Sequence, residues 1–189
     1  MVSCAAGGCS LFGHSGGQIQ IVTLDGQAAR LSGDLQTAIY RYRDTNTATF
    51  IFSDLSLDDL RNGRFGDGSV VCVDMAWRPK AGETPVDRTA TNCTVRQVIL
   101  TQSAAGVYDG AGFLAPSSRA GSDSFGGSIS GATLRLAESS DGFQDLLGTA
   151  ELSGSFTARR DDATVDQIAV RLNTEVSRRL GSLFYVLGY

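Results

Sequence analysis

Two β-like runs that each carry a cysteine, joined by a polar loop, most strongly constrain how this chain can fold. The runs are residues 69–77 and 92–101, and both are rich in Val, Ile and Thr. The loop between them contains Pro79, Gly82 and Pro85, which are turn-forming residues. This stretch therefore predicts a wide hairpin or a crossing between two sheets.

The two cysteines of this stretch, Cys72 and Cys93, are predicted to form a disulfide. If they lay directly opposite each other, the apolar face that carries Val71 and Val73 would lie beside a polar face. Either the first strand is central and buried on both faces, or the disulfide joins strands that are not neighbours. We favour the second arrangement, in which sulfur ties two sheets together and stabilises the fold by roughly 3 kcal/mol.

The rest of the chain reads as short strands separated by turns. The 189 residues suit a single domain, and the chain has 23 Gly, 3 Pro and only 19% charged residues, proportions that favour strands over long helices. Residues 106–114 predict a short edge strand broken at Asp109 and Gly110. The sequence therefore predicts a mainly β fold, an antiparallel β-sandwich or flattened barrel of about eight or nine strands. Further strands are expected at residues 18–24, 27–33, 37–42, 47–53, 128–138 and 148–158.

One amphipathic helix is predicted at residues 162–180. Its apolar residues recur at helical spacing and form one stripe. Asp161 and Asp162 lie at the predicted N-terminus, Arg178 lies in the last turn, and Gly181 follows as a stop signal. The helix is expected to pack against the sheet.

The chain divides into a Cys- and Gly-rich segment, residues 1–17, and a single β-rich domain, residues 18–189. Small residues surround Cys4 and Cys9, as they do around the acylated cysteine of bacterial lipoproteins. Neither cysteine follows the basic and apolar segments of a signal peptide. Two interpretations stay open: lipidation of Cys4 or Cys9, or a second disulfide between them.

Charge and hydropathy narrow the classes of partner. The net charge is −4 and no basic patch is evident, so we expect no nucleic-acid partner. No run of about 18 apolar residues predicts a membrane-spanning helix. The even number of cysteines in a strand-rich chain favours an extracytoplasmic location, with membrane contact only through a lipid anchor at the cell surface.

Motifs for catalysis, cofactors and metals are absent from the sequence. His14 is the single histidine, no CxxC pair occurs, and no glycine-rich phosphate loop precedes a helix. The acidic residues of the loop 138–145 resemble a solvated turn more than a calcium site. We therefore expect no enzyme, no cofactor and no metal.

Four residues form a candidate binding surface: Trp77, Arg78, Tyr40 and Tyr42. An aromatic ring beside a guanidinium suits a ligand or partner contact, and alternation places both tyrosines on one strand face. The competing interpretation, which we favour for Trp77 and the tyrosines, is that these rings belong to the core.

These observations predict a non-catalytic extracytoplasmic module for structure or binding, with a bacterial surface lipoprotein as the preferred class. Protein partners or self-association would fit this class. One alternative is a structural subunit of a larger assembly, such as a virion, filament or surface layer. The other is a hydrolase that uses carboxylates.

Overall fold

The structure is a computed structural model that describes residues 15–24, 30–80, 90–119 and 121–188, except for the side chains of residues 30–34. Nine strands form one sheet in the order β2-β1-β9-β3-β4-β5-β6-β7-β8, and β8 also pairs with β9. The strands are β1 (Gly16–Thr23), β2 (Arg30–Asp34), β3 (Thr37–Tyr42), β4 (Ala48–Ser53), β5 (Gly68–Met75), β6 (Cys93–Leu100), β7 (Ala105–Pro116), β8 (Ser124–Ser139) and β9 (Ala150–Arg160). The helices are α1 (Leu57–Asn62) and α2 (Asp162–Leu180).

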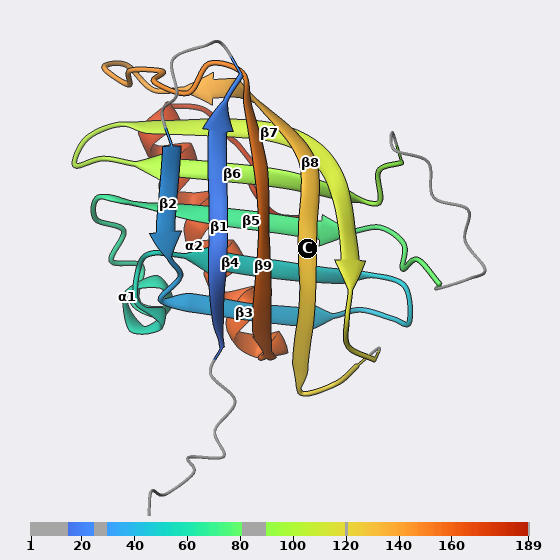
Figure 1. The fold of residues 1–189 in the computed structure, drawn as a ribbon. Coiled ribbons are helices and arrows are strands. Elements are labelled where there is room, and N and C mark those ends of the chain that lie inside the picture. The colour runs from blue at the N-terminus through green and yellow to red at the C-terminus, as the bar shows by residue number, and fades with distance from the viewer. Residues whose placement is uncertain (1–14, 25–29, 81–89, 120, 189) are drawn as a thin grey trace, which may run out of the picture.

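The sheet folds into two layers whose strands cross, as Figure 1 shows. β1, β2, β8 and β9 form the front layer, and β3 to β7 form the back layer. The sheet closes at β9, which pairs with β8 on one edge and on the other with β1 and, in parallel, with Ile39 and Tyr40 of β3. The predicted mainly β fold with a C-terminal helix is therefore confirmed, in a form between a sandwich and a flattened barrel.

β7 differs from the sequence-based expectation. It was predicted as a short edge strand, but it runs unbroken through Asp109 and Gly110 and pairs with β6 and β8. A Cβ at Gly110 would overlap the backbone of Thr133 on β8, so glycine here permits the close approach of the two strands. The glycine that suggested a break instead allows the pairing.

The back layer separates two hydrophobic cores. The inner core lies between the two layers and includes Phe50, Val73 and Tyr108. The outer core lies between the back layer and the helices, and it includes Ile51, Cys72 and Leu172. All six residues of β4 are buried because the strand faces apolar side chains on both sides. Strands β8 and β9 face solvent on one side, and their residues alternate between buried and exposed.

Helix α2 covers the outer face of the back layer (Figure 1) and confirms the predicted helix. The Asp161 carboxylate accepts a hydrogen bond from the Thr164 amide at 3.2 Å, and Gly181 ends the helix at φ 71°. Its buried stripe includes Val165, Ile168 and Leu172. Among the described residues, no helix has the length and hydropathy needed to cross a bilayer.

The predicted disulfide between Cys72 and Cys93 is wrong, because both residues are buried free thiols. β5 and β6 are hydrogen-bonded neighbours whose register pairs Cys72 with Arg96 and Cys93 with Met75. The two cysteines are thus three positions apart, roughly 10 Å along the strand, and a disulfide requires Cα atoms within about 7 Å. Cys72 also faces the outer core and Cys93 the inner core. The stretch is a hairpin, and its first strand is central and buried on both faces.

Candidate functional site

The structure brings the four predicted binding residues to one end of the two-layered sheet. Tyr42, Ala48 and Met75 are aligned across β3, β4 and β5, and Trp77 and Arg78 follow Met75 after one residue. Ser118, Gly121 and Ser122, between β7 and β8, contact this group. We call this region the arginine end.

Arg78 is the polar centre of the arginine end. Its guanidinium carbon lies 5.5 Å from the centroid of the Phe125 ring, and its Nη2 donates to the carbonyl oxygen of Ser118. The Trp77 ring makes an edge contact with Phe113, with 6.2 Å between the centroids. Trp77 and Arg78 are both half-buried, so each keeps some contact with solvent.

Tyr40 belongs to the core and not to a surface. It is fully buried, its ring stacks on Phe50 at 5.6 Å, and its hydroxyl donates to the carbonyl oxygen of Ser122. Burial raises the pKa of Tyr40, although the charge of Arg160 opposes this shift. Including Tyr40 in the candidate binding surface was therefore wrong, and the competing core interpretation holds for it.

Two buried hydrogen-bonding groups at the arginine end have no partner among the described residues. They are Nη1 of Arg78 and the hydroxyl of Tyr42. Arg78 contacts Ser118, and the Tyr42 ring lies beside Gly121. Buried N–H and O–H groups normally have partners, so this end retains capacity to donate hydrogen bonds.

The opposite end of the sheet contains a pocket that the sequence did not reveal. β6 ends and β7 begins there, and the loop 140–149 between β8 and β9 lies against their junction (Figure 1). The pocket has a volume of about 440 Å³. Its lining residues are Ile99, Thr101, Tyr108, Gly142, Phe143, Gln144, Leu146 and Leu147. We call this region the pocket end.

The loop 140–149 is anchored firmly on the β7 side. The Ser140 amide donates to the Ala105 carbonyl at 2.9 Å, and the Ala105 amide donates to the Ser140 hydroxyl at 2.8 Å. The Phe143 ring lies over Gly106, where any Cβ would overlap it. A glycine in β7 therefore creates the seat for the aromatic residue that lines the pocket.

Asp145 holds the other half of this loop. Its Oδ1 accepts hydrogen bonds from the Tyr108 hydroxyl at 2.7 Å, from the Gly148 amide at 2.9 Å and from the Leu147 amide at 3.1 Å. Partial desolvation would raise the pKa of Asp145, but these hydrogen bonds outweigh it and the pKa lies below its usual value. The carboxylate is therefore ionised at neutral pH.

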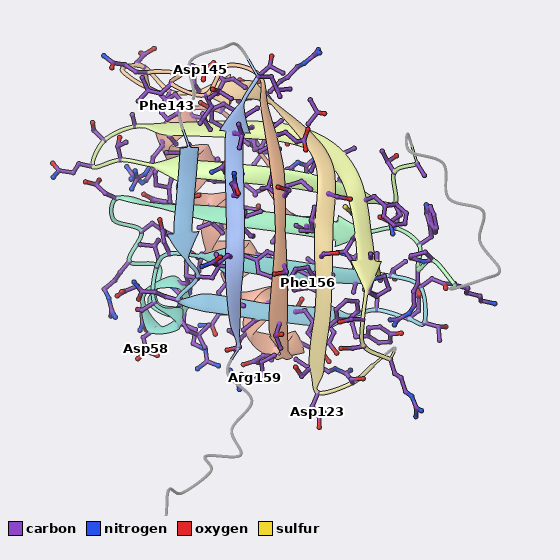
Figure 2. All side chains as sticks on the ribbon, viewed as in Figure 1. Asp58, Asp123, Phe143, Asp145, Phe156 and Arg159 are labelled. Carbon is purple, nitrogen blue, oxygen red and sulfur yellow. The ribbon has the colours of Figure 1, made fainter. Side chains whose placement is uncertain are left out.

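The pKa of Tyr108 moves in the opposite direction. Burial raises it most, and the hydrogen bond to the Asp145 carboxylate raises it further. The phenol consequently stays neutral and keeps its proton directed at Asp145. Figure 2 shows Asp145 and Phe143 close together at this end of the molecule and Asp123 at the opposite end.

The inner face of β6 carries a second acceptor below the pocket. Gln97 is directly opposite Tyr108 in the register of β6 and β7, and it is 2% exposed. Its Nε2 donates to the Ser69 hydroxyl at 3.1 Å, while its Oε1 has no partner among the described residues. The pocket end therefore retains acceptors where the arginine end retains donors.

A second hollow, of about 470 Å³, lies near the start of β4 and the end of β5 and is more polar than the first. Most of its polar groups form hydrogen bonds with one another or with the adjacent backbone. Thr49 donates to Asp74 at 2.7 Å, the Thr47 hydroxyl donates to Asp44 at 2.8 Å, and Arg43 donates to the Gly188 carbonyl at 3.2 Å. Little of its hydrogen-bonding capacity is left for a ligand.

The remaining predicted site residues form no further candidate site within the described residues. Cys4, Cys9 and His14 lie outside them, so their predictions stay untested. Within the described residues no group of three or more His, Cys, Asp or Glu side chains could hold a metal ion. Burial raises the pKa of the Cys93 thiol to about 11 and also raises that of Cys72, so both thiols are unreactive.

Sequence reasoning missed the pocket because its lining comes from three separate segments: the end of β6, the start of β7 and the loop 140–149. A weak signal was present. Phe143, Leu146 and Leu147 are large apolar residues within a stretch rich in Asp, Ser and Gly, and solvated turns seldom need them.

Comparison with protein-family models, with curated proteins and with solved structures finds no match to this chain.

Proposed function

We propose that this protein is a non-catalytic binding module that takes a small, mostly apolar molecule in the pocket under the loop 140–149. The observation that carries the proposal is the pocket itself. Its volume of about 440 Å³ lies within the range typical of small-molecule sites, and apolar side chains dominate its lining. A few polar atoms, chiefly those of Tyr108 and Gln144, would orient the ligand.

The arrangement of carboxylates supports binding over catalysis. Asp58 and Asp59 lie in the first turn of α1, and Asp161 caps α2. Asp145 is committed to holding the loop through three hydrogen bonds to Oδ1. Within the part of the chain that the structure describes, no carboxylate belongs to the pocket lining, which disfavours the hydrolase alternative for this site.

The extracytoplasmic location and the lipid anchor remain part of the proposal. Their support is now narrower, because Cys72 and Cys93 are free thiols and no longer indicate an oxidising compartment. Lipidation of Cys4 or Cys9 rests on the small residues around them. Mass spectrometry of the protein from its native host tests this directly, and an unmodified N-terminal segment with free thiols would remove the anchor from the proposal.

Binding is tested with the neutral fluorescent dye N-phenyl-1-naphthylamine. We expect a saturable rise in fluorescence with one site per chain. Ile99→Trp should fill the pocket and abolish the rise, because Ile99 lines it. Leu183→Trp is the matched control, since Leu183 is 76% exposed and is not part of the lining. Equal binding by both variants would overturn the proposal.

A second candidate function is recognition of an anionic group at the arginine end. The observation in its favour is that two buried groups, Arg78 Nη1 and the Tyr42 hydroxyl, have no hydrogen-bond partner among the described residues. A guanidinium binds carboxylate or phosphate oxygens well. Inorganic phosphate should raise the unfolding temperature of the wild type and not that of Arg78→Gln; an equal rise in both would exclude specific binding by Arg78.

A further inference from the structure

The charge around the pocket opening restricts the ligand that the pocket can take. Residues 142–144 line the pocket, and Asp141 and Asp145 flank them on either side. Asp141 is exposed, as is part of Asp145. Among the described residues, the lining contains no Lys or Arg. Asp145 also accepts a hydrogen bond from Tyr108, which lines the pocket. The described residues that border the opening therefore carry negative charge.

One guanidinium does approach the pocket, but its charge is already compensated. Arg179 reaches the turn 101–104 from α2, and it donates to the carbonyl oxygens of Thr101 and Ala104. Its side chain is 4% exposed and forms an ion pair with Glu175 at 2.7 Å. Arg179 holds the turn in place and does not present a charge to a ligand.

Among the described residues, the hydroxyl donors in the pocket lining are already used, and an acceptor remains available beside them. The Tyr108 hydroxyl donates to Asp145, and the Thr101 hydroxyl is engaged with Ala104. Asp145 Oδ1 already accepts three hydrogen bonds, which leaves Oδ2 available. The ring of Phe143 adds an aromatic face to the lining, and aromatic faces attract cations.

We propose that the ligand is an amphiphile with an apolar body in the pocket and a cationic group, such as a protonated amine, held at the opening by Asp141 and Asp145. This inference rests on the proposed function and names its ligand class. The low dielectric of an apolar pocket strengthens the attraction of a carboxylate for an ammonium group. The same environment disfavours a carboxylate-bearing ligand such as a fatty acid.

Three ligands of equal chain length separate the charge of the head group from the burial of the tail. Decylammonium, 1-decanol and decanoate are titrated against the bound N-phenyl-1-naphthylamine at neutral pH and low salt. We expect affinities in the order decylammonium, decanol, decanoate, with at least about a tenfold difference between the first and the last. High salt should reduce this difference, because ions screen the exposed carboxylates.

Substitutions then test whether the negative charge at the pocket opening causes this ligand preference. Asp141→Asn should lower the affinity for decylammonium and raise that for decanoate, with little change for decanol. Asp123→Asn is the matched control, because Asp123 is exposed and lies at the opposite end of the molecule (Figure 2). It changes the net charge equally but should leave all three affinities unchanged.

The outcomes distinguish the two proposals. If the dye does not bind, or binds the Ile99→Trp variant equally, the pocket is not a ligand site and the proposed function fails. If the dye binds and decanoate or decanol displaces it as well as decylammonium does, the pocket is a ligand site but the cationic class is wrong. The same conclusion follows if Asp123→Asn changes the ranking as much as Asp141→Asn.

Discussion

The two ends of this sheet are closed in opposite ways. At the arginine end, a cluster of aromatic rings fills the inner core: Phe125 contacts Tyr40, Phe50 and Phe156 with centroids 4.8 to 6.3 Å apart. At the pocket end, the Phe143 ring lies over Gly106 and makes an edge contact with Tyr108, and a cavity of about 440 Å³ remains beside it. Between the two layers, the inner core is thus filled by its own side chains at one end and left partly empty at the other.

The comparison also extends to charge. The filled end retains the unpartnered donors of Arg78 and Tyr42, whereas the hollow end carries the carboxylates of Asp141 and Asp145. Large side chains in the inner core stabilise the fold, and an unfilled volume gives up that stabilisation. We infer that the hollow end is kept for binding and the filled end for stability, and four predictions test this division.

The largest expected effect is at the filled end. Phe125→Ala removes a fully buried ring from the aromatic cluster and should lower the free energy of unfolding by about 3–5 kcal/mol. Leu146→Ala at the hollow end should change it by no more than about 0.5 kcal/mol, because Leu146 is 77% exposed. Urea unfolding of both variants measures the difference, and similar losses would contradict the division.

The second effect concerns the loop of the hollow end. Asp145→Asn weakens three hydrogen bonds to a carboxylate and should cost about 1 kcal/mol, reduced by solvent exposure. Because the folded pKa of Asp145 is lowered, its stabilisation is fully present above the unfolded pKa and is lost as the pH falls through the folded pKa. Urea unfolding from neutral pH downward should show the two proteins converging in acid. A constant difference would exclude Asp145 as the titrating group.

The third effect compares one tyrosine from each end. The folded pKa values of Tyr40 and Tyr108 are raised, first by burial. Their contribution to stability is therefore fully present below the unfolded pKa and is lost as the pH rises through the folded pKa. In ultraviolet titrations, Tyr40→Phe and Tyr108→Phe should each remove one late-titrating phenol. A variant that lost an ordinary phenol instead would show that its tyrosine is solvated.

The fourth prediction is that reducing conditions do not change the stability of the sheet. Adding dithiothreitol should leave the free energy of unfolding unchanged as far as Cys72 and Cys93 are concerned, whereas loss of a disulfide would cost roughly 3 kcal/mol. N-ethylmaleimide labelling followed by peptide mapping separates these thiols from Cys4 and Cys9. Both should react slowly in the folded protein, because they are buried and have raised pKa values, and rapidly once it unfolds.

Local features of the fold were predictable, and relations between distant segments were not. Helix α2 was predicted at its observed bounds, and β3 was predicted at residues 37–42. The disulfide prediction failed because the register of β5 and β6, and the presence of a core on both sides of β5, depend on partners remote in the chain.

The candidate site was predictable only in part. The aromatic and cationic side chains of Tyr42, Trp77 and Arg78 marked them as candidates, but nothing in the sequence placed them side by side. Nor did the sequence place Phe125 or Ser118 beside them. Tyr40 shares a strand face with Tyr42, yet one is fully buried and the other is half-exposed. Alternation assigns a face to a residue but not a depth, because depth depends on what covers the strand.

The sequence by itself determined the segments that become helix and strand, because backbone period, caps and turn residues act within a few residues of each other. Only the tertiary structure decided which face of each strand meets which core, how Cys72 and Cys93 came to lie on opposite sides of one layer, and where a pocket remains. Packing at one position depends on the volumes of side chains brought together from distant segments. For the pocket, the decisive contact was that of Phe143 with Gly106.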